Sequence, residues 1–135
     1  MTAAIRFEPA LVAADLRKEF ARQGIRIVAL DGTAIEDKET LLAELGRTLQ
    51  FPAYYGANWD AAEECLRDIS ARQGIALFIN RADEPWQRLP REMGTLVSIW
   101  LSASNELSKQ GSPLQLIFLL ERPLNTPPSP PERAG

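Results

Sequence analysis

Three short, almost continuously apolar runs constrain the fold most strongly. They are IRIVAL at 25–30, IALFI at 75–79 and LQLIFLL at 114–120. Runs of this length, bounded by Gly, Pro and Asp, are typical of strands rather than helices. Because their apolar character does not alternate, both faces of each strand are predicted to be buried, as in a parallel sheet covered by helices.

Segments with helical spacing of apolar residues separate these runs. They lie at about 9–23, 37–49, 58–72 and 91–110. Strands that alternate with helices indicate βαβ units. We therefore predict an α/β fold with a small three-stranded parallel sheet covered by helices.

The ends of the chain differ from its centre. Residues 1–24 are predicted to be an N-terminal helical extension, 25–121 one folded domain, and 122–135 a disordered tail. The tail, RPLNTPPSPPERAG, is rich in proline and has almost nothing to bury. For the first helix, packing against the sheet and formation of a dimer remain equally open.

Charge and composition exclude several functions. The chain has no histidine and one cysteine, Cys65, so neither a serine–histidine nor a cysteine–histidine mechanism can be assembled, and a zinc site lacks ligands. We expect no metal and no cofactor. A net charge of −3 argues against nucleic acid as a partner, and no run is long enough to span a membrane. The lone cysteine and the missing secretory signal favour a cytoplasmic protein.

The stretch FPAYYGANWDAAEECLRDI, at 51–69, combines aromatic and acidic residues around one glycine. Asn58 is a candidate N-cap of its helix. One face of that helix is predicted to be buried and consists of Trp59, Ala62, Cys65, Leu66 and Ile69. On another side Asp60, Glu63 and Glu64 stand at i, i+3 and i+4, so their carboxylates should converge.

This acidic helix has two possible interpretations. Acids in a first helical turn are favoured by the helix dipole, so the face could be ordinary solvated surface. Alternatively, the aromatic pair Tyr54 and Tyr55 directly before it favours a recognition surface, with one of the two tyrosines filling the core. A carboxylate pair of Asp60 and Glu64 could also serve an enzyme, but it lacks a nucleophile and a cleft, so we expect no enzyme.

The same stretch, read as PAYYGANWDAAEECL, resembles the barstar family, cytoplasmic inhibitors that protect bacteria from their own secreted ribonuclease, barnase. The family pattern is matched without a gap by Pro52, Tyr54, Tyr55, Gly56, Asn58, Trp59, Asp60, Ala61, Glu64, Cys65 and Leu66. LDGTAI at 30–35 and NELSKQGSPLQLIFLL at 105–120 resemble other parts of the family. The resemblance thus covers 25–120 and implies a barstar-like fold over the predicted domain.

The resemblance also implies a function and a set of contact residues. The protein would bind and block the cationic active site of a barnase-like ribonuclease or related basic toxin. Asp60 and Glu64 would enter that site, while Tyr54, Gly56 and Asn58 would shape or contact the surface around it. Counting back from Gly111, Glu106 falls where the family has a further acid. The full set of predicted partner-binding residues is Tyr54, Gly56, Asn58, Asp60, Glu63, Glu64, Arg67 and Glu106.

Three departures from the family pattern concern the choice of partner. Glu64 stands where the best-known member has an aspartate, and Glu63 replaces a tryptophan. Arg67 replaces a neutral contact residue, and a cation there would repel a basic enzyme. The partner is therefore predicted to be a relative of barnase or another basic toxin. The alternative is a regulatory protein–protein interaction module with a partner that is not a nuclease.

Overall fold

The computed structural model describes residues 4–52, 54–70, 74–108 and 113–124, without the side chains of residues 70 and 105–108. Its sheet has the order β1-β4-β3-β2, and the neighbouring strands run parallel. The strands are β1 (Ile5–Pro9), β2 (Arg26–Asp31), β3 (Ile75–Asn80) and β4 (Leu114–Leu120). The predicted α/β class and parallel sheet are confirmed, and β2, β3 and β4 coincide with the three apolar runs.

The predicted number of strands is wrong, because the sheet has four strands and not three. The additional strand, β1, lies at the edge of the sheet beside β4, with Phe7 in register with Phe118. Its sequence, IRFEP, places the charged residues Arg6 and Glu8 between apolar ones. These charged residues interrupt the apolar run, so the pattern that identified the other strands does not detect β1, whereas β2, at the opposite edge of the sheet, keeps an almost continuous apolar run.

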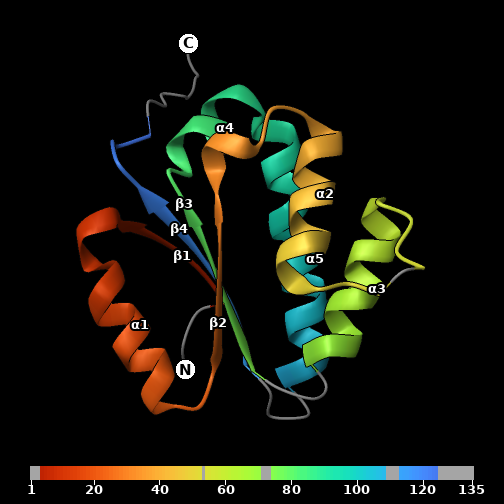
Figure 1. Ribbon diagram of the computed structural model, residues 1–135, viewed down its shortest axis with the longest axis horizontal. Helices are drawn as coiled ribbons and strands as arrows, with labels where there is room; N and C mark the ends of the chain where they lie inside the picture. Colours follow the sequence, from red (N-terminus) through yellow and green to blue (C-terminus); the bar gives the residue numbers. More distant parts are fainter. Residues whose placement is uncertain (1–3, 53, 71–73, 109–112, 125–135) are drawn as a thin grey trace.

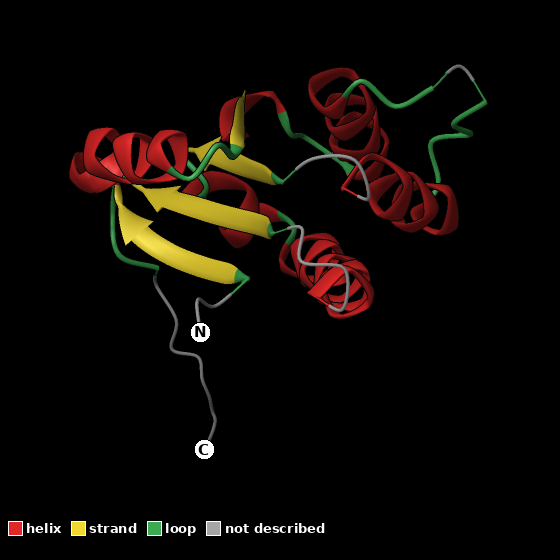
Figure 2. Cartoon of the chain, turned by 90° about the horizontal axis from the view of Figure 1, so that it is seen from below, coloured by secondary structure: helices red, strands yellow, loops and turns green. Residues whose placement is uncertain are grey.

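Helices cover both faces of the sheet (Figures 1 and 2). On one face lies α1 (Ala13–Arg22), and on the other lie α2 (Lys38–Leu49), α3 (Trp59–Ser70) and α5 (Pro90–Ser108). The outermost of these is α3, which packs on α5 and α2. The short elements are α4 (Asp83–Arg88) and the 3-10 helices η1 (Ala10–Val12) and η2 (Gly32–Ala34). Within the described ranges, no helix combines the length and apolarity needed to cross a membrane.

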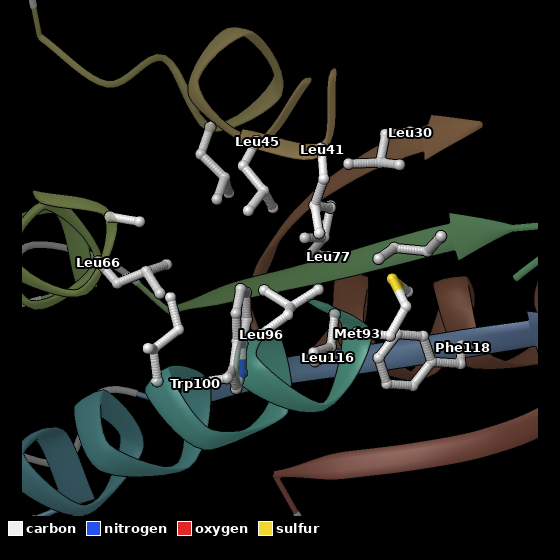
Figure 3. Close-up of a cluster of buried hydrophobic side chains, with 14 of the residues drawn as sticks. Leu30, Leu41, Leu45, Leu66, Leu77, Met93, Leu96, Trp100, Leu116 and Phe118 are labelled. Atoms are coloured by element: carbon white, nitrogen blue, oxygen red, sulfur yellow. The ribbon is translucent and has the colours of Figure 1, made fainter. Parts of the chain in front are cut away.

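The sheet separates two buried clusters of apolar side chains. Leu77 and Leu116 belong to the larger cluster, between the sheet and α2, α3 and α5, and Figure 3 shows them beside Trp100. Phe78 and Ile117, the next residues in each strand, belong to the smaller cluster under α1. Successive residues of a strand point to opposite faces, so burial on both sides requires the continuous apolar runs seen in the sequence.

The first helix packs against the sheet, which is one of the two roles left open by the sequence. Leu16 and Phe20 of α1 are buried, and the rings of Phe20 and Phe78 meet edge to face at 5.9 Å. The helix ends before Gly24, whose φ of +73° is a conformation that favours glycine. Together with β1, this helix extends the α/β layers beyond the predicted domain of 25–121.

Candidate functional site

The N-terminus of α3 is held by a side-chain cap. Oδ1 of Asn58 accepts a hydrogen bond from the Ala61 N–H at 2.8 Å, and the Asn58 carbonyl accepts from the Ala62 N–H at 2.9 Å. This confirms the predicted N-cap. Ala57, just before it, has a φ of +52°, so the chain turns sharply into the helix. The first turn of α3 is thereby fixed relative to the loop that precedes it.

The inner face of α3 is buried as the sequence predicted. Ala62, Cys65 and Leu66 are almost inaccessible, while Trp59 and Ile69 are partly buried against the same cluster. Burial raises the pKa of the Cys65 thiol, with the charges of Asp68 and Glu64 as weaker causes. A neutral, inaccessible thiol acts here as a small apolar side chain.

Two carboxylates project from the outer face of α3. Asp60 and Glu64 are both exposed, and one helical turn separates them. Neither makes a hydrogen bond or ion pair with a residue in the described part of the chain. They therefore present two adjacent negative charges that are free to bind a partner.

The third predicted carboxylate, Glu63, points elsewhere. It forms an ion pair with Arg67, and its Oε2 accepts a hydrogen bond from the Ser102 hydroxyl of α5 at 2.7 Å. Arg67 also approaches the same hydroxyl, at 3.4 Å. Glu63 thus does not converge with Asp60 and Glu64, because α5 offers it a hydrogen-bond donor. Glu63 and Arg67, which both depart from the family pattern, are therefore paired with each other.

The two tyrosines of the loop have opposite roles. Tyr55 is partly buried, its hydroxyl donates to the Leu42 carbonyl at 2.9 Å, and burial raises its pKa to about 12. Its ring lies so close to Gly46 that a Cβ there would be 2.6 Å from Cε2. Tyr54 is 68% exposed and donates to Oδ2 of Asp68 at 3.2 Å. One tyrosine therefore supports the loop from inside, as predicted, and the other faces solvent.

An open hollow of about 550 Å³ adjoins this exposed tyrosine. Its lining residues are Gln50, Pro52, Tyr54, Asp68 and Ile69. It lies between the end of α2 and the second half of α3, beside the outer acidic face. We define the candidate surface as Tyr54, Asp60, Glu64 and Asp68 together with this hollow.

The remaining predicted residues lie around this surface or outside the described side chains. Gly56 is exposed, and a Cβ there would be 3.2 Å from Nδ2 of Asn58. Glu106 belongs to α5, but its side chain is not among those described. Across the described ranges, no three acidic or thiol side chains gather closely enough to hold a metal ion.

A scan against protein-family models matches residues 25–119 to Barstar (barnase inhibitor). This is more than two thirds of the 135 residues. The chain belongs to the barstar family. Its members are inhibitors that bind ribonucleases, so the resemblance seen in the motif at 52–66 is confirmed. No curated protein matches the chain. The match to the family model begins at residue 25, after α1, so β1 and α1 lie outside the part that the family model covers.

Three residues that contact side chains of α3 or of the loop before it were not identified from the sequence. Ser102 holds Glu63 and Arg67, Glu92 accepts a hydrogen bond from Nε1 of Trp59 at 3.3 Å, and Asp68 binds Tyr54. Ser102 and Glu92 come from α5, some 30 to 40 residues further along the chain, and no local pattern connects them to α3. Asp68 did carry a signal, since it stands at i+4 from Glu64 in the same acidic stretch.

Proposed function

We propose that this barstar-family protein inhibits a barnase-like ribonuclease or a related basic toxin by covering its cationic active site with the candidate surface. The observation that carries the proposal is the state of Asp60 and Glu64. Both are exposed, one turn apart, and without a partner among the described residues, whereas the neighbouring Glu63 and Arg67 are paired.

The chemistry of the target explains why such a pair of acids would inhibit. A ribonuclease binds RNA phosphates with arginine and lysine side chains. Carboxylates at a fixed spacing can form charge-assisted hydrogen bonds with the same cations and exclude the substrate. Opposite fields on the two proteins also accelerate their encounter.

The support of α3 keeps the acids in place before the partner arrives. The Asn58 cap fixes the first turn, and the buried face with Leu66 anchors the second. A surface that is ordered in advance loses less conformational entropy on binding. The hollow beside Tyr54 and Asp68 gives room for one side chain of the partner.

The pairing of Glu63 with Arg67 bears on which enzyme is bound. Arg67 would repel a cationic enzyme if it stood free, but its charge is compensated by Glu63 and held near Ser102 of α5. The tryptophan that Glu63 replaces would have offered an aromatic contact. We therefore infer a partner related to barnase rather than barnase itself, with a different side chain facing this position.

The test compares two matched charge reversals. Asp60→Lys with Glu64→Lys changes the candidate surface, while Asp15→Lys with Glu19→Lys makes the same change at the same spacing on α1, across the sheet. RNA hydrolysis by barnase and a panel of small, basic barnase-like ribonucleases is measured against increasing protein. We expect inhibition of at least one enzyme, its loss in the first variant, and its retention in the second.

Two outcomes would contradict the proposal. If the Asp60 and Glu64 variant inhibits as well as the wild type, the surface is wrong. If no enzyme of the panel is inhibited, the inhibitor function is wrong, and the regulatory module with a partner that is not a nuclease takes its place.

A further inference from the structure

The outer edge of β1 carries backbone groups that the sheet does not use. β1 is an outermost strand of the sheet, whose order is β1-β4-β3-β2, and it pairs only with β4. The Leu116 N–H donates to the Ala4 carbonyl at 2.8 Å, so Ala4 directs its polar groups toward β4. Because this direction alternates along a strand, Ile5 and Phe7 direct their N–H and C=O groups to the open edge. Figure 2 shows this edge on the side of the sheet away from β3 and β2.

Phe7 gives the same edge an exposed aromatic ring. The ring stacks on Phe118 at 4.9 Å and meets Trp86 at 5.5 Å, yet Phe7 remains 45% exposed. It is thus held in place on its inner side and open on its outer side. An exposed edge strand with an apolar residue at its centre is a template for pairing with another strand.

The charges of β1 are complementary to a second copy of the same strand. Arg6 and Glu8 lie on the opposite face from Phe7 and form an ion pair at 2.7 Å within one chain. If two copies pair antiparallel with Phe7 opposite Phe7, each Arg6 lies directly opposite the Glu8 of the other copy. Centring the pair on Arg6 or on Glu8 instead would place like charges opposite each other.

We propose that β1 pairs antiparallel with β1 of a second copy, about a two-fold axis at Phe7, and joins the two sheets into one. In this register the two Phe7 residues exchange both backbone hydrogen bonds, and each Ile5 N–H reaches the Pro9 carbonyl of the other copy. Pro9 has no N–H, so the pairing ends there. Such an interface is small, and we expect a weak dimer.

The proline-rich tail is a less suitable occupant of this edge. Residues 125–135 contain four prolines, and each removes the N–H that a ladder of hydrogen bonds requires. In contrast, β1 of a second chain offers backbone donors and acceptors around Phe7, and it places Glu8 opposite Arg6. The dimer uses no residue of the candidate surface, so it does not depend on the proposed inhibitor function.

The test uses two single variants and their mixture. In Arg6→Glu every opposed pair is acidic, and in Glu8→Arg every opposed pair is basic, so each variant alone should be monomeric. In an equal mixture, the acidic strand of one chain faces the basic strand of the other, and a heterodimer should form. Mixing does not restore an ion pair within either chain, because residues 6 and 8 of each variant still carry charges of the same sign. Recovery of the dimer must therefore come from pairing between the two variants.

Sedimentation velocity from about 10 µM to about 1 mM, a range chosen for a weak interface, measures the association. We expect a concentration-dependent dimer for the wild type, at least about a tenfold higher Kd for each variant, and recovery in the mixture. Arg22→Glu and Glu19→Arg, which alter an exposed ion pair of α1, serve as matched controls and should dimerise like the wild type.

Several outcomes would overturn the proposal. They are a wild type that stays monomeric at every concentration, single variants that dimerise normally, and a mixture that stays monomeric although circular dichroism shows both variants folded. Hydrogen exchange at the Phe7 amide adds an independent readout. Protection that increases with dimer formation supports the pairing, whereas protection in a monomer shows that another segment of the same chain covers the edge.

Discussion

Helices α1 and α3 carry the same acidic spacing in different surroundings. Asp15 and Glu19 on α1 stand at i and i+4, as Asp60 and Glu64 do on α3. On α1, Glu19 accepts hydrogen bonds from Arg22 at 2.8 Å and Gln23 at 3.1 Å. On α3, the nearby cation Arg67 is paired with Glu63, so Asp60 and Glu64 form no ion pair with a described residue.

The packing of the two helices differs as well. α1 lies directly on the sheet, where Arg17 also covers the Phe78 ring at 4.8 Å. α3 packs on α5 and α2, further from the sheet (Figure 1). Its acids Asp60 and Glu64 are exposed. Spacing therefore creates an acidic face on both helices, and the neighbouring cations and elements make only one of them a candidate binding surface.

The largest expected effect concerns the anchoring of α3. Leu66→Ala should lower the free energy of unfolding by about 3 kcal/mol, because it leaves a cavity among fully buried side chains. Leu16→Ala on α1, at a slightly more accessible site, should cost about 2 kcal/mol. Urea unfolding followed by circular dichroism measures both, with the 85% exposed Leu11→Ala as control. Equal values for Leu66→Ala and Leu11→Ala would show that α3 is not anchored by this face.

The next effect separates the two acidic faces. Glu64→Gln keeps the size of the side chain and removes its charge, and it should weaken binding to the inhibited ribonuclease about 30-fold, since a paired cation loses its partner. Glu19→Gln on α1 should leave the affinity within about twofold, because its charge lies on the other side of the sheet. Isothermal titration calorimetry at two salt concentrations checks both values. An equal loss of affinity in both variants would indicate that the partner responds to the net charge of the protein and not to the candidate surface.

A smaller effect concerns the contact between α3 and α5. Ser102→Ala removes the hydroxyl that binds Glu63 and should lower the free energy of unfolding by about 1 kcal/mol. Ser98→Ala, one turn earlier on the exposed side of α5, should change it by less than about 0.5 kcal/mol. Thermal and urea unfolding provide the comparison. If the two variants are equally stable, the ion pair of Glu63 and Arg67 does not depend on α5.

The smallest effect is a pH dependence from the loop that supports α3. The pKa of Tyr55 is raised to about 12, mainly by burial, so between about pH 10 and 12 the unfolded chain loses this proton while the folded protein retains it. Stability should therefore fall as the pH rises through this window. Tyr55→Phe should make that fall shallower, as seen in urea midpoints measured from pH 9 to 12. An unchanged slope in Tyr55→Phe would assign the fall to other groups.

Much of the fold was predictable because its signals are local. The cap at Asn58 could be predicted because its side chain binds an N–H group of its own helix, only three residues further along the chain. β2, β3 and β4 are recognisable because their apolar runs are almost continuous, as burial on both faces demands of the inner strands β3 and β4. The edge strand β1 has no such signal, because only its pairing with β4 gives IRFEP the geometry of a strand.

By itself, the sequence determined the strands β2, β3 and β4, the capped acidic helix and the membership of the barstar family, because periodicity, capping and a gapless motif are properties of neighbouring residues. Only the tertiary structure decided the fourth strand, the inward turn of Tyr55 and the outward turn of Tyr54. It also decided that Glu63 and Arg67 face Ser102 while Asp60 and Glu64 face solvent. The physical reason is that each of these depends on a donor, an acceptor or a strand edge supplied by a distant part of the chain.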